Sequence, residues 1–152
     1  MMDKKRAFCT NSAISVFRII PRGFDVQNAC ASFDVQLNWN FPQTTHELEV
    51  DSLFERYPDL RRHRCHSGRH RSFYDEARQT ETAHLLEHLA VELLVQSGVS
   101  RSKAAGKTGI PRDNNRAYYR LNFYGTSSLE QMDVLLHQAA DILEELIFAR
   151  HL

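Results

Sequence analysis

Alternating apolar and polar residues near the start of the chain predict β-strands. The clearest alternation lies in residues 32–40 (SFDVQLNWN), where every second residue is apolar. A period of two is typical of a strand with one buried face. The apolar run at residues 13–20 (AISVFRII) predicts a strand before it, which we expect to end in a turn at residues 21–23 (PRG). Residues 47–50 are a further candidate for the sheet, and residues 117–124 (AYYRLNFY) predict its last strand.

Two longer segments carry the spacing of helices. In residues 80–96, five leucines gather on one side when successive residues are placed about 100° apart, and we expect Gly98 to end this helix. Residues 128–149 predict a final helix, with Ser127 or Ser128 as its N-cap.

The segments between these elements are expected to be short or irregular. A short helix capped by Asp51 or Ser52 should stop before Pro58. Residues 59–72 are polar, basic and rich in histidine, which indicates an exposed loop, and residues 99–115 indicate a polar, mobile connection.

The composition is that of a globular protein, with 42% hydrophobic and 25% charged residues. Together with the order of strands and helices it predicts an α+β protein, in which a small mixed or antiparallel sheet packs against two long helices as a layer sandwich. A single domain over residues 1–152 is the simplest organisation for this length.

Charge and cysteine content indicate which partners and which cellular compartment to expect. The formal net charge is zero, so no overall field draws the chain to nucleic acid, and we expect no such partner. Ser15 and Arg18 interrupt the N-terminal apolar run, and no segment approaches the ~20 apolar residues of a membrane helix, so we expect neither a secretory signal nor a membrane partner. Three cysteines without C-x-x-C spacing favour a reducing compartment, the cytoplasm.

The residues His84-Leu85-Leu86-Glu87-His88 form an H-x-x-E-H motif within the first long helix. Because helix positions four apart lie on one face, His84 and His88 can offer two imidazoles to a single metal ion. Glu87 projects from the same side, where it can take a proton from water activated by the metal. This is the arrangement of the inverted zinc peptidases, the inverzincins. Alternatively, the two histidines are surface residues paired with nearby glutamates.

A catalytic zinc site usually has three protein ligands and leaves the fourth position to water. We prefer Glu130 as the third ligand, because a glutamate on a following helix completes the site in H-x-x-E-H peptidases. The alternative role for Glu130 is to complement the dipole of its helix. Glu92 lies about 80° around the helix from His84, so we expect it to orient a histidine from outside the ligand set, or else to serve as an alternative ligand.

The motif is part of a longer set of residues that resembles a known family. The set consists of Pro58-Asp59-Leu60, His63, Cys65, residues 84–93 (HLLEHLAVEL), Gly98, residues 118–121 (YYRL), Glu130-Gln131 and residues 139–143 (AADIL). It resembles the N-terminal domain of cyanophycin synthetase, the enzyme that builds an aspartate–arginine storage polymer. The resemblance implies a small α+β domain that holds zinc and, in some synthetases, hydrolyses the polymer into shorter primers. By this resemblance, His84 and His88 correspond to metal ligands, Glu87 to the catalytic glutamate and Glu130 to the third ligand.

The sequence also departs from this family. The synthetase continues into ATP-grasp and ligase-like domains that have no counterpart in these 152 residues, so we expect a stand-alone domain. The arginine-bearing, glycine-rich segment after the motif helix is replaced by residues 100–109 (SRSKAAGKTG). The resemblance therefore carries over the chemistry rather than the identity of the substrate.

His63, Cys65, His66 and His70 form a second candidate metal cluster, but four ligands within eight residues are cramped for tetrahedral zinc. We prefer a basic loop in which Cys65 packs inward as a small apolar residue. The arginines within residues 61–71 are candidates to contact an anionic group of a substrate.

These patterns favour a zinc-dependent hydrolase that acts on a peptide or poly-amino-acid substrate. In this hypothesis His84, His88 and Glu130 hold Zn²⁺, and Glu87 is the general base. The alternative is a non-catalytic binding module in which the metal is structural or vestigial. A closed site with four protein ligands, for which Cys65 is a candidate, would favour the module, and an open position beside Glu87 would favour the hydrolase.

Overall fold

The computed structural model describes residues 15–65, 72–110 and 117–151. In these residues the chain forms, in order, β1 (Phe17–Asp25), β2 (Cys30–Leu37), α2 (Val50–Arg56), the 3₁₀ helix η1 (Pro58–Arg62), α3 (Phe73–Glu76), α4 (Thr82–Gln96), β3 (Ala105–Gly109), β4 (Tyr118–Tyr124) and α5 (Leu129–His151). The predicted α+β class is confirmed. No helix in this part of the chain is long and apolar enough to cross a membrane.

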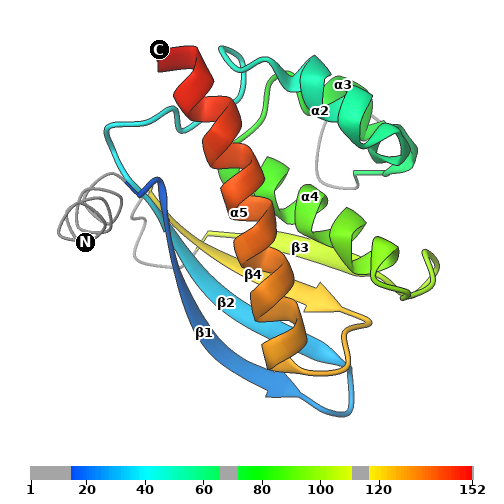
Figure 1. The fold of residues 1–152 in the computed structure, drawn as a ribbon. Coiled ribbons are helices and arrows are strands. Elements are labelled where there is room, and N and C mark those ends of the chain that lie inside the picture. Colours follow the sequence, from blue (N-terminus) through cyan, green and yellow to red (C-terminus); the bar gives the residue numbers. More distant parts are fainter. Residues whose placement is uncertain (1–14, 66–71, 111–116, 152) are drawn as a thin grey trace, which may run out of the picture.

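The described strands form one antiparallel sheet with the order β1-β2-β4-β3. One face of the sheet is apolar: Phe33 lies opposite Leu121 and Val35 opposite Tyr119, and all four residues are buried. Helices α4 and α5 lie side by side on this face (Figure 1), with α4 against β3 and β4 and α5 against β1 and β2. The hydrophobic core fills the space between the sheet and the two helices, as the alternation in β2 and the leucines of α4 predict.

The opposite face of the sheet is polar and holds a buried carboxylate. Asp34 accepts hydrogen bonds from Arg120 Nε and from the hydroxyl of Tyr118, and it is 1% exposed. Burial raises the pKa of Asp34, but the bonds from Arg120 and Tyr118 outweigh it and hold the pKa below its ordinary value.

The turn predicted at residues 21–23 is wrong. Strand β1 continues to Asp25, opposite Cys30 of β2, with a bulge between Pro21 and Gly23. Because β1 lies at the edge of the sheet, a proline that lacks an N–H group is tolerated there.

Residues 99–115 are not an irregular connection throughout, because they contain β3. The sequence of this strand, AGKTG, has little intrinsic preference for a strand, and the strand exists through its pairing with β4, where Lys107 lies opposite Asn122. Residues 47–50 do not extend the sheet.

Helix α2 begins at Val50 and its N-cap is Glu49, which makes no side-chain cap bond, so the predicted caps Asp51 and Ser52 are wrong. The ends of the two long helices agree with prediction. Beyond α4, Gly98 adopts a φ of 120°, which favours glycine, and Ser128 caps α5 by accepting a hydrogen bond from the backbone N–H of Gln131 at 3.0 Å.

The segment expected to be an exposed loop, residues 59–72, is partly buried in its described part, and residues 66–71 lie outside the described residues. Its described arginines are exposed, but Leu60, His63 and Cys65 are buried. The helix η1 contacts α2, α3 and α4, which places this segment against the motif helix.

Candidate metal centre

The motif helix α4 is buried around almost its whole circumference. Every residue from 82 to 94 is buried, and the exposed fractions of His84, Glu87 and His88 are 8%, 3% and 6%. The leucines pack in the core, as their spacing predicts. The histidine side is covered as well, because η1 and β3 both contact α4. The motif therefore forms one wall of a covered cleft rather than an open surface.

This cleft has a volume of about 970 Å³. The motif residues His84, Glu87 and His88 line it, together with Cys65 and residues 104–108, which include most of β3. Charged side chains of both signs also line it, among them Arg62, Arg64, Lys107, Glu76 and Glu81.

Three side chains in the cleft form a group that could hold a metal ion. Cys65, His84 and His88 each offer one ligand atom, and these atoms all lie within 4.8 Å of one another. Sγ of Cys65 is 3.5 Å from Nε2 of His84. Ligand atoms of a tetrahedral zinc ion that carries sulfur and imidazole nitrogen are about 3.4–3.6 Å apart, given the usual bond lengths. The distance between Cys65 and His84 therefore fits a shared zinc ion, and the three donors together form a possible metal site without identifying the metal.

Both histidines are held in the neutral form that binds metal. Burial lowers the pKa of His84, and Glu76 only partly opposes this effect. Burial lowers the pKa of His88 well below its ordinary value, and the nearby His84 and His63 rings lower it further.

Hydrogen bonds and ring packing fix the two imidazoles. Thr80 Oγ1 lies 2.9 Å from Nδ1 of His84, which leaves Nε2 directed toward Cys65. The ring of Phe73 stacks on His88 with the centroids 3.7 Å apart, and it meets His84 edge-on.

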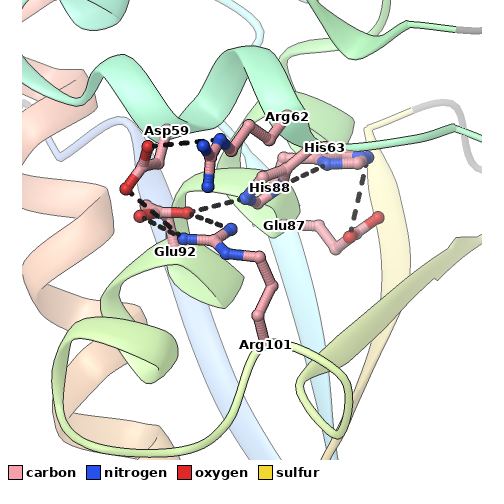
Figure 2. Close-up of polar contacts among 7 residues, drawn as sticks. All are labelled: Asp59, Arg62, His63, Glu87, His88, Glu92 and Arg101. Carbon is pink, nitrogen blue, oxygen red and sulfur yellow. Dashed lines mark hydrogen bonds and ion pairs between the residues drawn. The ribbon is translucent and has the colours of Figure 1, made fainter.

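A relay of hydrogen bonds runs from His88 through His63 to Glu92 and Arg101 (Figure 2). Nδ1 of His88 lies 3.0 Å from Nδ1 of His63, and Nε2 of His63 lies 2.8 Å from Oε1 of Glu92. Arg101 donates to both carboxylate oxygens of Glu92, at 3.0 and 3.2 Å, and also pairs with Asp59 of η1. The motif helix is thereby tied to η1 and to the turn that follows α4.

Charges along the relay determine which atoms carry protons. Burial raises the pKa of Glu92, but hydrogen bonds from Arg101 and His63 outweigh it and keep the pKa below its ordinary value, so Glu92 is ionised. Burial lowers the pKa of His63 despite the neighbouring Glu92, so His63 is neutral. Neutral His63 donates a hydrogen bond to Glu92 through Nε2–H, and its Nδ1 then accepts a hydrogen bond from the Nδ1–H group of His88. Nε2 of His88 is left with a free lone pair, as a metal ligand requires.

Glu87 lies between the two motif histidines and β3. Its Oε1 is 3.9 Å from Nε2 of His84, and its Oε2 is 3.8 Å from Nε2 of His88. Thr108 of β3 donates a hydrogen bond to Oε1 at 3.1 Å. Burial raises the pKa of Glu87 to about 7, and the bond from Thr108 opposes that rise only in part.

The predicted site residues divide into two sets. The structure brings His84, Glu87 and His88 together. Glu92 is linked to His88 by hydrogen bonds through the ring of His63. Glu130 is not brought to them, because its side chain is exposed in the first turn of α5 whereas the metal group is buried between α4 and the end of η1. Cys65 occupies the place in the group that Glu130 was expected to take.

Of the second candidate cluster, the structure describes only His63 and Cys65. Cys65 does pack inward, as we preferred, but it faces His84 rather than His63. His66 and His70 lie outside the described residues. No pattern in the sequence indicates Thr80 or Arg101 as part of the site. His63 and Cys65 are indicated, because both belong to the residues that carry the family resemblance.

Comparisons with known proteins yield a family match over most of the chain. The family model described as "Cyanophycin synthase-like N-terminal domain" matches residues 32–148, which is more than half of the 152-residue chain. No curated protein and no solved structure matches the chain.

Proposed function

The chain belongs to the cyanophycin synthase-like N-terminal domain family, and on that basis we propose that it is a zinc-dependent hydrolase of peptide bonds. One observation carries the proposal: Cys65, His84 and His88 converge on one position in a cleft, with the Glu87 carboxylate within 4 Å of both histidines. Three protein donors and an adjacent carboxylate are what a catalytic zinc centre requires.

The residues that would hold the metal are Cys65, His84 and His88. When bound, zinc supplies a Lewis acid that lowers the pKa of water and polarises a carbonyl group. Glu87 accepts a proton from the attacking water at a carboxylate oxygen and returns it to the nitrogen of the leaving amine. Burial raises the pKa of Glu87 to about 7 in the metal-free protein, and a divalent cation beside it would favour the ionised carboxylate that accepts a proton.

The proposed substrate is a poly-amino acid that carries both charges, of which the aspartate–arginine polymer is the first candidate. Arg62, Arg64 and Lys107 can pair with its carboxylates, and Glu76 and Glu81 with its guanidinium groups, since all five line the cleft. The proposed role also needs Cys65 as a thiol rather than in a disulfide. Cys65 is not in a disulfide, and a reducing compartment such as the cytoplasm would keep it so.

The test combines metal content with turnover. Protein purified without chelator or histidine tag should contain about one zinc per chain by elemental mass spectrometry. Cys65→Ser should lose most of this zinc, and Cys30→Ser, a matched buried free cysteine outside the group, should keep it. Glu87→Gln should keep zinc and lose at least a hundredfold of the hydrolysis of the aspartate–arginine polymer, the lower end of what general base catalysis contributes.

The outcomes separate the two hypotheses. A Glu87→Gln variant with full activity would remove the mechanism, and zinc retained by Cys65→Ser would remove that ligand. The alternative, a non-catalytic module with a structural metal, needs a fourth protein ligand, whereas the group in the described residues offers three. Zinc-loaded protein that leaves every peptide substrate intact would favour the module.

A further inference from the structure

Among the described residues, strand β3 has one edge without a partner strand, and this free edge lies beside the candidate metal centre. In the sheet order β1-β2-β4-β3 it is an outermost strand, and no described residue outside β4 pairs with it. Half of the backbone N–H and C=O groups of an edge strand point away from its single partner. Such groups can pair with a second extended chain.

The free edge of β3 faces the cleft. Residues 104–108 line the cleft without interruption. Side chains of a strand alternate between the two faces of a sheet, so Ala105 and Lys107 point away from α4, whereas Gly106 and Thr108 point toward Glu87. When residues of both faces line one cavity, the backbone edge between them borders it. The small residues Ala104, Ala105 and Gly106 leave this edge accessible.

The backbone of β3 lies directly beside the proposed catalytic residue, Glu87. A Cβ atom at Gly106 would stand 2.6 Å from Oε2 and 2.9 Å from Cγ of Glu87, so the backbone of β3 passes directly against this side chain. Two residues along, Thr108 donates to the other oxygen of the same carboxylate. A chain paired with β3 would lie about 4.8 Å from it, and so would run past Glu87 and the metal-binding group.

We propose that β3 is the docking strand of the cleft, and that it binds its substrate as an extended peptide main chain through backbone hydrogen bonds. This inference rests on the proposed function. It assigns the recognition of the main chain to β3 and leaves the charged residues of the cleft to recognise side chains. It therefore predicts that binding requires an extended substrate backbone and depends on the N–H group of every second substrate residue.

The experiment is a backbone N-methyl scan of a synthetic substrate. The probe is an oligomer of aspartate residues, each carrying arginine on its side-chain carboxyl group, and each member of the series has one main-chain N–H replaced by N–CH₃. Binding is measured by calorimetry on the zinc-loaded Glu87→Gln protein, which should bind without turnover. Wild-type protein is assayed in parallel for cleavage of the unmodified oligomer.

Because alternate residues of a paired strand direct their N–H groups to the same side, the losses should recur at every second position. Each blocking methyl group should weaken binding about tenfold, and the intervening positions should change it little. Binding that is insensitive to N-methylation, or that varies without a period of two, would overturn the docking strand and leave the hydrolase intact if the oligomer is cleaved. An oligomer that is neither bound nor cleaved would overturn the proposed function, and this inference with it.

Discussion

Replacing His63 with phenylalanine tests the relay that holds His88. The histidine side chain is 9% exposed and is bonded on both sides, to Nδ1 of His88 at 3.0 Å and to Glu92 at 2.8 Å. Phenylalanine has a similar shape and fits the aromatic surroundings, since the ring of Phe73 lies 6.3 Å away. The substitution therefore removes the two hydrogen bonds while changing the packing little.

The expected loss of metal affinity follows from the hydrogen bonds that remain in the variant and the one that His88 loses. Glu92 keeps its two bonds from Arg101, so its carboxylate stays paired. Nδ1 of His88 loses its partner in a buried site, which costs about 1–3 kcal/mol and frees the ring to place its proton on Nε2, the atom that faces Glu87. Removing a partner that orients a ligand typically costs 10–100-fold in metal affinity, or about 1.4–2.7 kcal/mol.

Zinc affinity is measured by competition with a chromophoric chelator, and His46→Phe serves as the control because His46 is an exposed histidine away from the cleft. Nitrogen-15 NMR of the metal-free protein reports the protonated nitrogen of His88, which should be Nδ1 in the wild type and should change in His63→Phe. A variant with wild-type zinc affinity and an unchanged His88 spectrum would refute the reasoning, whatever its stability.

Two further perturbations have defined outcomes. Gly106→Ala should lower the free energy of unfolding by about 1–3 kcal/mol, because the new Cβ would stand 2.9 Å from both Glu87 Cγ and Val91 Cγ2. Gly23→Ala, whose Cβ would meet no atom within 4 Å, is the control in urea denaturation, and equal losses in both variants would contradict the close approach. Asp34 should make the protein sensitive to acid. Its pKa is lower in the folded than in the unfolded chain, so the unfolded chain binds more protons as the pH falls. The stability that Asp34 contributes above about pH 4 is therefore lost as the pH falls through the folded pKa. Urea denaturation at pH 7 and pH 3 should show a smaller loss for Asp34→Asn, and an equal loss would remove Asp34 as the cause.

Features that depend on local periodicity could be predicted from the sequence. The alternation in β2 and the leucine spacing in α4 arise from side chains facing one core, and the H-x-x-E-H spacing places His84 and His88 together by helix geometry alone. The class, the two long helices and the convergence of the motif follow from such patterns.

Features that depend on contacts between distant segments could not be predicted in this way. The five residues of β3 have weak strand preference and are held by pairing with β4, and β1 passes through Pro21 only because it lies at a sheet edge. Cys65 reaches His84 because η1 packs on α4. No spacing within a helix or strand contains that contact, so local patterns could not indicate that Cys65 joins the two histidines of the motif.

The separation of Cys65 from His84 has a consequence for folding. A metal shared by these two residues would close a loop whose ends are 19 residues apart in sequence. In the chain-entropy treatment of cross-links, closing a loop of this length restricts the unfolded chain by about 3 kcal/mol. The ion would thus stabilise the folded chain by linking Cys65 to α4, and removing it would lower the free energy of unfolding as well as remove the chemistry.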